Sequence, residues 1–133
     1  CLSLKKPIQK KHGNILEFAR FANLPNYSVI GGFQKLLKHV LEYTKKEGFD
    51  GILTYADLRL GGNAGQTYLK SGFDFLGRTP IDYWYTDGKK REFRFKYRAQ
   101  KPLTEKQVAK NNGVLPVYGC GSNIYLYNIV QTI

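Results

Sequence analysis

The stretch that decides the fold is residues 63–73, NAGQTYLKSGF, which follows the apolar run GILTYA at residues 51–56. A short apolar run of this kind predicts a buried strand. Asn63 is a residue type that commonly begins a helix, and Gly72 is the type that ends one in a left-handed cap. The chain then turns into a further strand. The plainest interpretation is an amphipathic helix that places Tyr68 in the core between two strands.

The rest of the chain also alternates strands with helices. Apolar residues recur every three or four positions between Phe33 and Glu47, which predicts an amphipathic helix. The spacing of Thr104 and Gln107 matches a capping box and predicts a short helix that ends at Gly113. Strands are expected at residues 2–4, 15–22, 51–56 and 73–78. The sequence therefore predicts a single α+β domain over residues 1–133, with a mixed sheet and flanking helices.

Two hairpins are expected in the C-terminal half. Asp87-Gly88 separates two aromatic runs, which is a strong hairpin signal. Strands at residues 114–118 and 124–130 are expected to pair with each other through the intervening glycine-rich turn. Alternation along residues 91–98 predicts one packed face and one exposed, mostly basic face. The packed face comprises Arg91, Phe93, Phe95 and Tyr97, and the exposed face comprises Glu92, Arg94, Lys96 and Arg98.

The chain is strongly basic, with 21 Lys and Arg against 10 Asp and Glu and a formal net charge of +11. Much of the excess lies between Lys89 and Lys101, where Glu92 is the only acid. A solvated surface is one interpretation, whereas the size of the total excess favours a polyanionic partner, with DNA first. The expected phosphate contacts are Lys89, Lys90, Arg91, Arg94, Lys96 and Arg98. The adjacent Tyr83, Trp84 and Tyr85 either stack on exposed bases or pack the hairpin.

Several protein classes are disfavoured by composition. No run of about 18 apolar residues is present, so no membrane segment is expected, and the N-terminus lacks the pattern of a signal peptide. Two cysteines and two histidines predict neither a disulfide framework nor a metal site. The sequence has no Met and begins with the strand-like run Cys1–Leu4. We therefore expect a cytoplasmic protein and a C-terminal fragment of a longer chain, of undetermined oligomeric state.

The spacing of Asn63, Tyr68 and Gly72-Phe73 resembles the second half of N-acetyltransferase domains of the GNAT superfamily. Further runs are similar to phage-encoded, Mom-type DNA-modification proteins and to domains attached to homing endonucleases. These runs are VIGGFQKLL at residues 29–37, YADLR at 55–59, DYWY at 82–85 and YGCG at 118–121. The resemblance covers residues 2–127. It implies an acyl-CoA N-acetyltransferase-like sheet that lacks the first strands and splays between residues 15–22 and 51–56.

The resemblance also implies a site for acetyl-CoA or another acyl-CoA. In such enzymes a glycine-rich turn opening a helix holds the pyrophosphate through backbone N–H groups. The matching turn comprises Val29, Ile30, Gly31, Gly32 and Phe33, with Asn63 nearby in the second helix. Ser28 and Phe33 depart from the family pattern, and the bulky Phe33 is expected to crowd the pyrophosphate. The alternative is a tight turn that needs glycine only for backbone freedom.

Catalytic roles follow from the resemblance in the same way. Tyr68 would protonate the leaving thiolate, and Glu17 or Asp57 would orient or deprotonate an amine. Asp57 and Arg59 are alternatively a local ion pair. Two functions therefore remain open. The first is a DNA-associated domain of a phage or mobile-element protein that binds DNA or modifies bases; the second is an ordinary acyl-CoA-dependent N-acetyltransferase.

Overall fold

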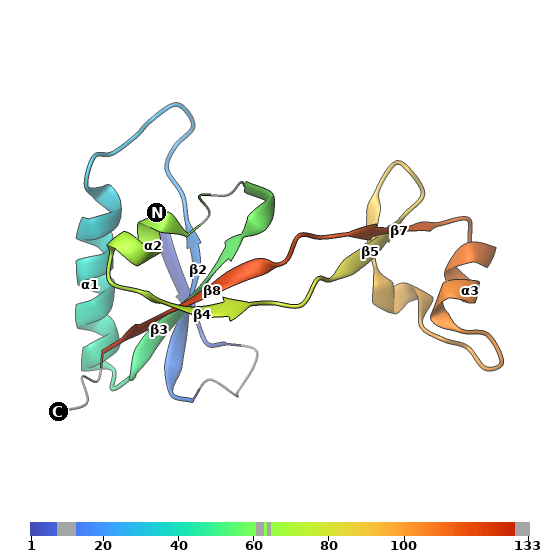
Figure 1. Cartoon of the computed structure of the whole chain (residues 1–133). Helices are drawn as coiled ribbons and strands as arrows, with labels where there is room; N and C mark the ends of the chain where they lie inside the picture. Colours follow the sequence, from blue (N-terminus) through green and yellow to red (C-terminus); the bar gives the residue numbers. More distant parts are fainter. Residues whose placement is uncertain (8–12, 61–62, 64, 130–133) are drawn as a thin grey trace. The chain divides into compact units, whose positions relative to one another are not determined.

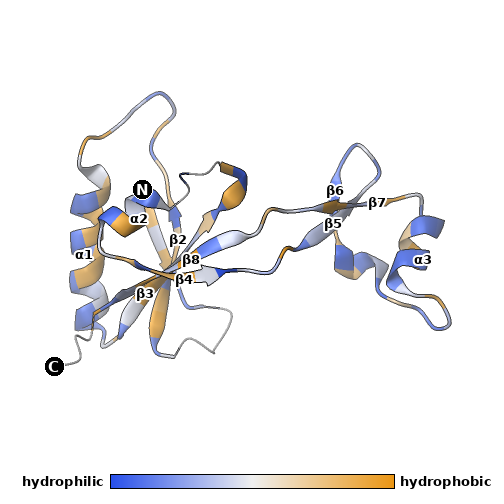
Figure 2. Ribbon diagram, viewed as in Figure 1, coloured by the Kyte–Doolittle hydropathy of each residue, from blue (hydrophilic) through white to orange (hydrophobic). Residues whose placement is uncertain are grey.

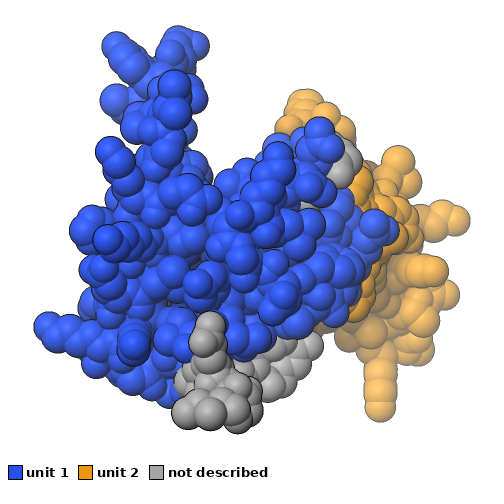
Figure 3. Space-filling view, turned by 60° about the vertical axis from the view of Figure 1, so that its left-hand side comes forward, with its two compact units in different colours: residues 1–79, 122–133 blue, residues 80–121 orange. Residues whose placement is uncertain are grey.

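A computed structural model describes residues 1–7, 13–60, 63 and 65–129 of the chain. The chain divides into two compact units, which Figure 3 shows in different colours. Unit 1 comprises Cys1–Thr79 and Ser122–Ile133, and unit 2 comprises Pro80–Gly121. Unit 2 is therefore an insertion in the sequence of unit 1. A single domain was predicted over residues 1–133, and the division into two units was not foreseen.

Unit 1 is built on a five-stranded mixed sheet (Figure 1). The strands follow one another across the sheet in the order β1 (Leu2–Lys5), β2 (Ile15–Phe21), β3 (Gly51–Asp57), β8 (Ser122–Asn128) and β4 (Asp74–Arg78). β2 and β3 are parallel, and the other neighbours are antiparallel. The expectation of an α+β fold with a mixed sheet is confirmed, as are the four strands predicted for this unit.

Two helices, α1 (Gly32–Lys46) and α2 (Gln66–Lys70), pack on the same face of this sheet. Phe33 and Leu37 are one turn apart on α1 and are buried against Phe18 and Ile52 of the sheet. Hydrophobic and hydrophilic bands accordingly alternate along α1 in Figure 2. The predicted helix is confirmed to within a residue. No helix in the described part of the chain is both long and apolar enough to cross a bilayer.

The start of α2 differs from the prediction. The helix begins at Gln66, with Gly65 as its N-cap at φ 90°, and not at Asn63. The Asn63 carbonyl instead accepts a hydrogen bond from the Gln66 N–H at 3.1 Å in the preceding turn. A Cβ atom on Gly65 would lie 2.2 Å from the Tyr125 hydroxyl oxygen. Both the backbone conformation and the close approach of Tyr125 therefore require glycine here.

Unit 2 is a three-stranded antiparallel sheet with helical turns on one face. The strand order is β6 (Arg91–Phe93), β5 (Tyr83–Thr86) and β7 (Leu115–Tyr118). The 3₁₀-helix η3 (Arg94–Tyr97) and α3 (Glu105–Asn111) follow in the chain. Its core comprises Tyr85, Tyr97, Val108, Ala109 and Val114. The predicted capping box is confirmed, because Thr104 and Gln107 exchange side-chain and backbone hydrogen bonds.

Two strand predictions in this region are wrong. Residues 91–98 are not one strand, because β6 ends at Phe93 and η3 begins at once. This turn brings Tyr97 into the core, where its ring centroid lies 5.1 Å from that of Tyr85. The predicted hairpin of residues 114–118 with 124–130 does not form either, since β7 pairs with β5 and β8 pairs with β3 and β4. The hairpin around Asp87-Gly88 is confirmed.

Candidate functional site

Unit 1 contains a cavity of about 330 Å³ where its two parallel strands separate. β2 and β3 pair only from Ile15–Phe18 against Gly51–Thr54, although each strand continues for three more residues. The cavity is lined by residues beyond that pairing and by residues of α1 and α2. The strands thus splay at their carboxyl ends, as expected. Carboxyl ends of neighbouring parallel strands are common ligand sites in open sheets.

Tyr68 lines this cavity from α2. Its half-buried ring packs among four other rings at centroid distances of 5.5–6.2 Å, those of Phe18, Phe33, Phe73 and Tyr125. No hydrogen bond joins its hydroxyl to another residue in the described part of the chain. The core therefore fixes the position of the ring at the cavity wall, where the hydroxyl is a candidate proton donor.

Asp57 also lines the cavity, at the end of β3. Its carboxylate accepts hydrogen bonds from the backbone N–H of Arg59 at 2.9 Å and from the Arg59 Nε at 2.9 and 3.0 Å. The local ion pair considered for these two residues is thus present. Arg59 therefore holds the Asp57 carboxylate at the cavity wall.

Glu17 lies on the other face of the sheet from Tyr68. Phe18 packs on Phe33 and Tyr68, and successive side chains of a strand point to opposite faces. Glu17 instead forms an ion pair with Lys5 at 3.0 Å. Burial, and then the charge of Glu17, raises the pKa of Tyr55, which lines the cavity. The structure therefore places Glu17 beside the cavity wall but does not bring it to Tyr68.

The predicted glycine turn precedes α1. Gly31 is the N-cap at φ 69°, and no side chain caps the first turn of the 15-residue helix. The first N–H groups of such a helix have no acceptor within it and can bind an anion. Phe33 was expected to crowd a pyrophosphate at this turn. Its ring is instead buried against Phe18, Phe21 and Tyr68. Ile30, by contrast, is almost fully exposed at 97%.

In unit 2, two carboxylates engage three of the six predicted phosphate ligands. Glu92 forms ion pairs with Lys90 at 3.1 Å and Lys96 at 2.9 Å. It also accepts a hydrogen bond from the Tyr97 hydroxyl. These hydrogen bonds, that of Tyr97 first, lower the pKa of Glu92 to about 2. Glu92 therefore remains charged and holds both lysines.

Glu105 holds Arg94 in a similar way. Their ion pair measures 3.4 Å, and the Glu105 carboxylate also accepts hydrogen bonds from the hydroxyls of Tyr83 and Tyr85. The hydrogen bond to Glu105 raises the pKa of Tyr83 to about 12, and the same bond lowers the pKa of Glu105. The predicted stripe of Arg94, Lys96 and Arg98 along one strand face is therefore wrong, because η3 breaks the alternation and two members are paired with acids.

Other cations of unit 2 are exposed and form no ion pair with any residue that the structure describes. They are Lys89, Arg91, Arg98, Lys101, Lys106 and Lys110. Nine basic and four acidic residues lie within the 42 residues of unit 2, against twelve and six in the 91 residues of unit 1. Unit 2 thus carries the higher density of net positive charge.

One face of the unit 2 sheet is left uncovered. Trp84 lies directly opposite Phe93 and Val117, and Thr86 lies opposite Arg91 and Leu115, so these six side chains share what we call the open face. Phe93 is 74% exposed and Leu115 is 71% exposed. The Arg91 guanidinium lies over the Trp84 ring, 4.4 Å from its centroid. No member of the open face is acidic.

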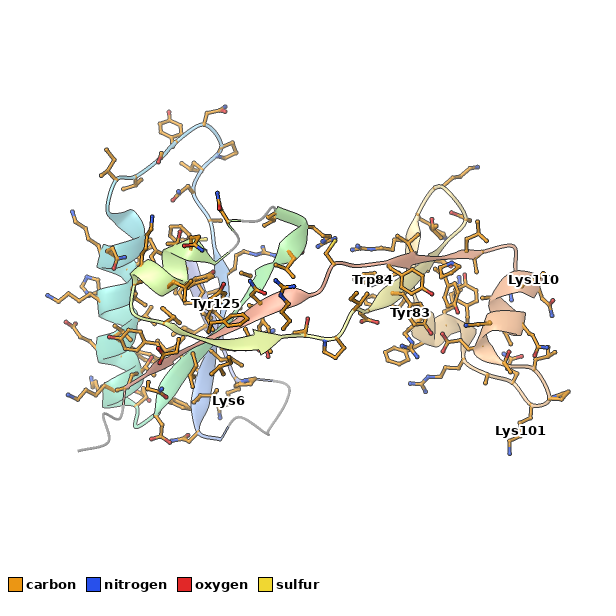
Figure 4. The ribbon with its side chains drawn as sticks, in the orientation of Figure 1. Lys6, Tyr83, Trp84, Lys101, Lys110 and Tyr125 are labelled. Atoms are coloured by element: carbon orange, nitrogen blue, oxygen red, sulfur yellow. The ribbon has the colours of Figure 1, made fainter. Side chains whose placement is uncertain are left out.

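The opposite face of this sheet is packed. Tyr83 and Trp84, labelled in Figure 4, are consecutive residues of β5 and therefore lie on opposite faces. Tyr83 and Tyr85 face α3, which confirms core packing for two of the three aromatics proposed to stack on bases. Sequence reasoning placed Phe93 on a packed face and so missed its exposure. The short loop between β5 and β6 could have indicated this exposure, because it sets the register that places Phe93 opposite Trp84.

A second cavity, of about 750 Å³, lies between β7 and α3 within unit 2. Lys106 and Lys110, one turn apart on α3, line it together with Tyr83 and Tyr118. Its lining combines aromatic and aliphatic side chains with these two lysines, which can pair with an anionic group of a ligand.

The described residues include no cluster of three His, Cys, Asp or Glu side chains that would hold a metal ion. Cys1 and Cys120 are both free and exposed. No protein-family model matches this sequence, and no curated protein matches it either.

Proposed function

We propose that this chain is a DNA-associated protein and that unit 2 provides its main contact with DNA. One observation carries the proposal: six exposed cations of unit 2 have no acidic partner among the described residues. The carboxylates of Glu92 and Glu105 instead bind tyrosines, two lysines and an arginine. Such cations neutralise phosphates and release counterions. A cytoplasmic phage or mobile-element protein, as the resemblance implies, is consistent with this role.

The lysines around α3 test the proposal. Replacing Lys101, Lys106 and Lys110 together by Ala should weaken duplex binding. It should also reduce the slope of log K against log salt concentration by up to about 2.7, at roughly 0.9 per lost contact. A matched control replaces Lys35, Lys38 and Lys46 of α1, which are also exposed. The control removes the same charge from unit 1. Duplex binding by the two variants is measured by fluorescence anisotropy at several salt concentrations. Equal slopes of log K against log salt concentration for both variants would contradict a specific role of unit 2.

A second function, binding of an acyl-CoA with transfer of its acyl group, is favoured by the cavity of unit 1. Its walls combine aromatic rings with the Tyr68 hydroxyl at the carboxyl ends of splayed strands. The uncapped first turn of α1 adjoins the cavity through Phe33 and offers N–H groups to a pyrophosphate. These features support the proposed likeness to a GNAT domain. Tyr68 would then serve as general acid.

Titration calorimetry with acetyl-CoA tests this second function. Replacing Ile30 by Asp places a negative charge in the turn before α1 and should weaken binding, whereas Leu24→Asp, at another exposed site of unit 1, should not. Tyr68→Phe should preserve binding and slow acyl transfer. Absence of binding at millimolar acetyl-CoA would remove this second function and leave the DNA proposal intact.

A further inference from the structure

We propose that the open face of the unit 2 sheet binds unpaired DNA bases, so that this unit prefers single-stranded to duplex DNA. The inference rests on the proposed association with DNA and adds the form of DNA that is recognised. Its site is the open face defined above, which comprises Trp84, Thr86, Arg91, Phe93, Leu115 and Val117.

The first step of the argument is the exposure of apolar groups. Phe93 lies on the edge strand β6, and Leu115 and Val117 lie on the other edge strand, β7, on either side of Trp84 in β5; the three are 74%, 71% and 42% exposed. The same small unit buries Tyr85 and Tyr97 almost completely on its other face. A sheet with one packed face normally presents polar residues on its solvated face. Contiguous exposed apolar groups instead mark a binding surface.

The second step is the chemistry of the open face. Arg91 stacks on Trp84 at 4.4 Å and has no acidic partner among the described residues. Unpaired bases stack on aromatic rings and on arginine guanidinium planes. The acids Glu92 and Glu105 lie on the packed side, where they bind tyrosines. The six members of the open face thus offer flat apolar surfaces and the positive charge of Arg91, and none of the six is acidic, which complements a polyanion that carries planar groups.

The third step is geometric. The side chains of Trp84 and Phe93 are directly opposite in neighbouring antiparallel strands, where Cβ atoms are about 5 Å apart. The open face therefore presents an aromatic–guanidinium stack beside a second ring, enough for two adjacent bases. Lys89 lies in the loop that joins β5 to β6 and stands next to this surface along the chain, where it can meet a phosphate. Duplex DNA keeps its bases stacked on one another and cannot offer their faces to such a surface.

The chain contains a single tryptophan, so the intrinsic fluorescence of Trp84 reports directly on the open face. Three probes of fifteen nucleotides are compared at low salt: oligo(dT), an abasic strand with the same phosphates, and a duplex. Oligo(dT) should quench Trp84 and bind tightest. Charge alone predicts the opposite order, because the duplex has the most phosphates. Equal binding of the abasic strand, or tighter binding of the duplex, overturns the inference.

Two phenylalanine variants locate the contact. Phe93→Ala should weaken oligo(dT) binding by about 5- to 150-fold, the loss of stacking on one base. Phe95→Ala is the matched control, since Phe95 is 63% exposed, carries a stacked arginine at 4.8 Å and belongs to η3 rather than the open face. The control should bind oligo(dT) as the parent does. Equal effects of the two variants, or no effect of Phe93→Ala, overturn the inference.

Two further outcomes separate this inference from the proposal on which it rests. If no probe binds at low salt, the association with DNA fails as well. If the duplex binds and oligo(dT) binds no better, DNA association stands and only the open-face inference fails. If Phe93→Ala instead abolishes self-association measured by sedimentation velocity and leaves oligo(dT) binding unchanged, the open face is an interface between copies of this chain, and the inference also fails.

Discussion

Replacing Gly65 by Ala tests how tightly the start of α2 is built against the sheet. Gly65 has φ 90°, a conformation that costs an alanine about 1–2 kcal/mol. The new Cβ would also lie 2.2–2.4 Å from three atoms of the Tyr125 ring, so the ring or the helix must shift. Overpacking of this kind costs about 1–3 kcal/mol. We therefore expect unit 1 to lose about 2–5 kcal/mol of unfolding free energy.

Gly31 supplies the control for this experiment. It is also a left-handed N-cap of unit 1, at φ 69°, but has open space where a Cβ would lie. Gly31→Ala should therefore cost only the backbone part. Urea unfolding followed by far-ultraviolet circular dichroism measures both variants. Equal losses for the two would refute the argument that contact with Tyr125 makes Gly65 necessary.

The remaining predictions concern unit 2, and the fluorescence of Trp84 reports the unfolding of this unit. The pKa of Glu92 is lowered to about 2, so its hydrogen bonds stabilise unit 2 fully above the ordinary pKa near 4.5 and are lost as the pH decreases towards 2. The urea concentration at the unfolding midpoint should therefore decrease between pH 4.5 and pH 2, and Glu92→Gln should reduce this pH dependence. Arg94→Ala with Lys96→Ala should change the salt slope of duplex binding by well under the ~1.8 units of two lost contacts, since both side chains already engage carboxylates. Thr104→Ala should cost about 1 kcal/mol through loss of the cap on α3, measured by the same unfolding curves.

The sequence was sufficient for most of unit 1 because local patterns there agree with the tertiary structure. Five of the six residues in the apolar run 51–56 of β3 are buried, and the apolar positions of α1 coincide with its packed side. The cap of α3 was also readable, because a capping box is completed within four residues. In each case the residues that decide the element are neighbours in the chain.

Predictions failed where residues distant in the chain decide the outcome. Alternation along residues 91–98 was overridden because burial of Tyr97 against Tyr85 requires the chain to coil after Phe93. The strands β7 and β8 are separated by a short glycine-rich run, but each pairs with strands far earlier in the chain. Pairing partners of this kind are set by global topology, which spacing across a turn does not contain. For the same reason the exposure of Phe93 was not foreseen.

The route by which the chain enters and leaves unit 2 has a consequence for folding. The Thr79 N–H donates to the Ser122 carbonyl, and the Ser122 N–H donates to the Thr79 hydroxyl, both at 2.9 Å, so β4 and β8 meet where the insertion begins and ends. Pairing them across 42 unfolded residues costs about 2 kcal/mol more closure entropy than pairing across a four-residue turn. Early folding of unit 2 would reduce this cost, because the Gly119 N–H bonds the Asp82 carbonyl at 2.8 Å near its two ends. A short turn grafted between Thr79 and Ser122 should therefore yield a faster-folding unit 1.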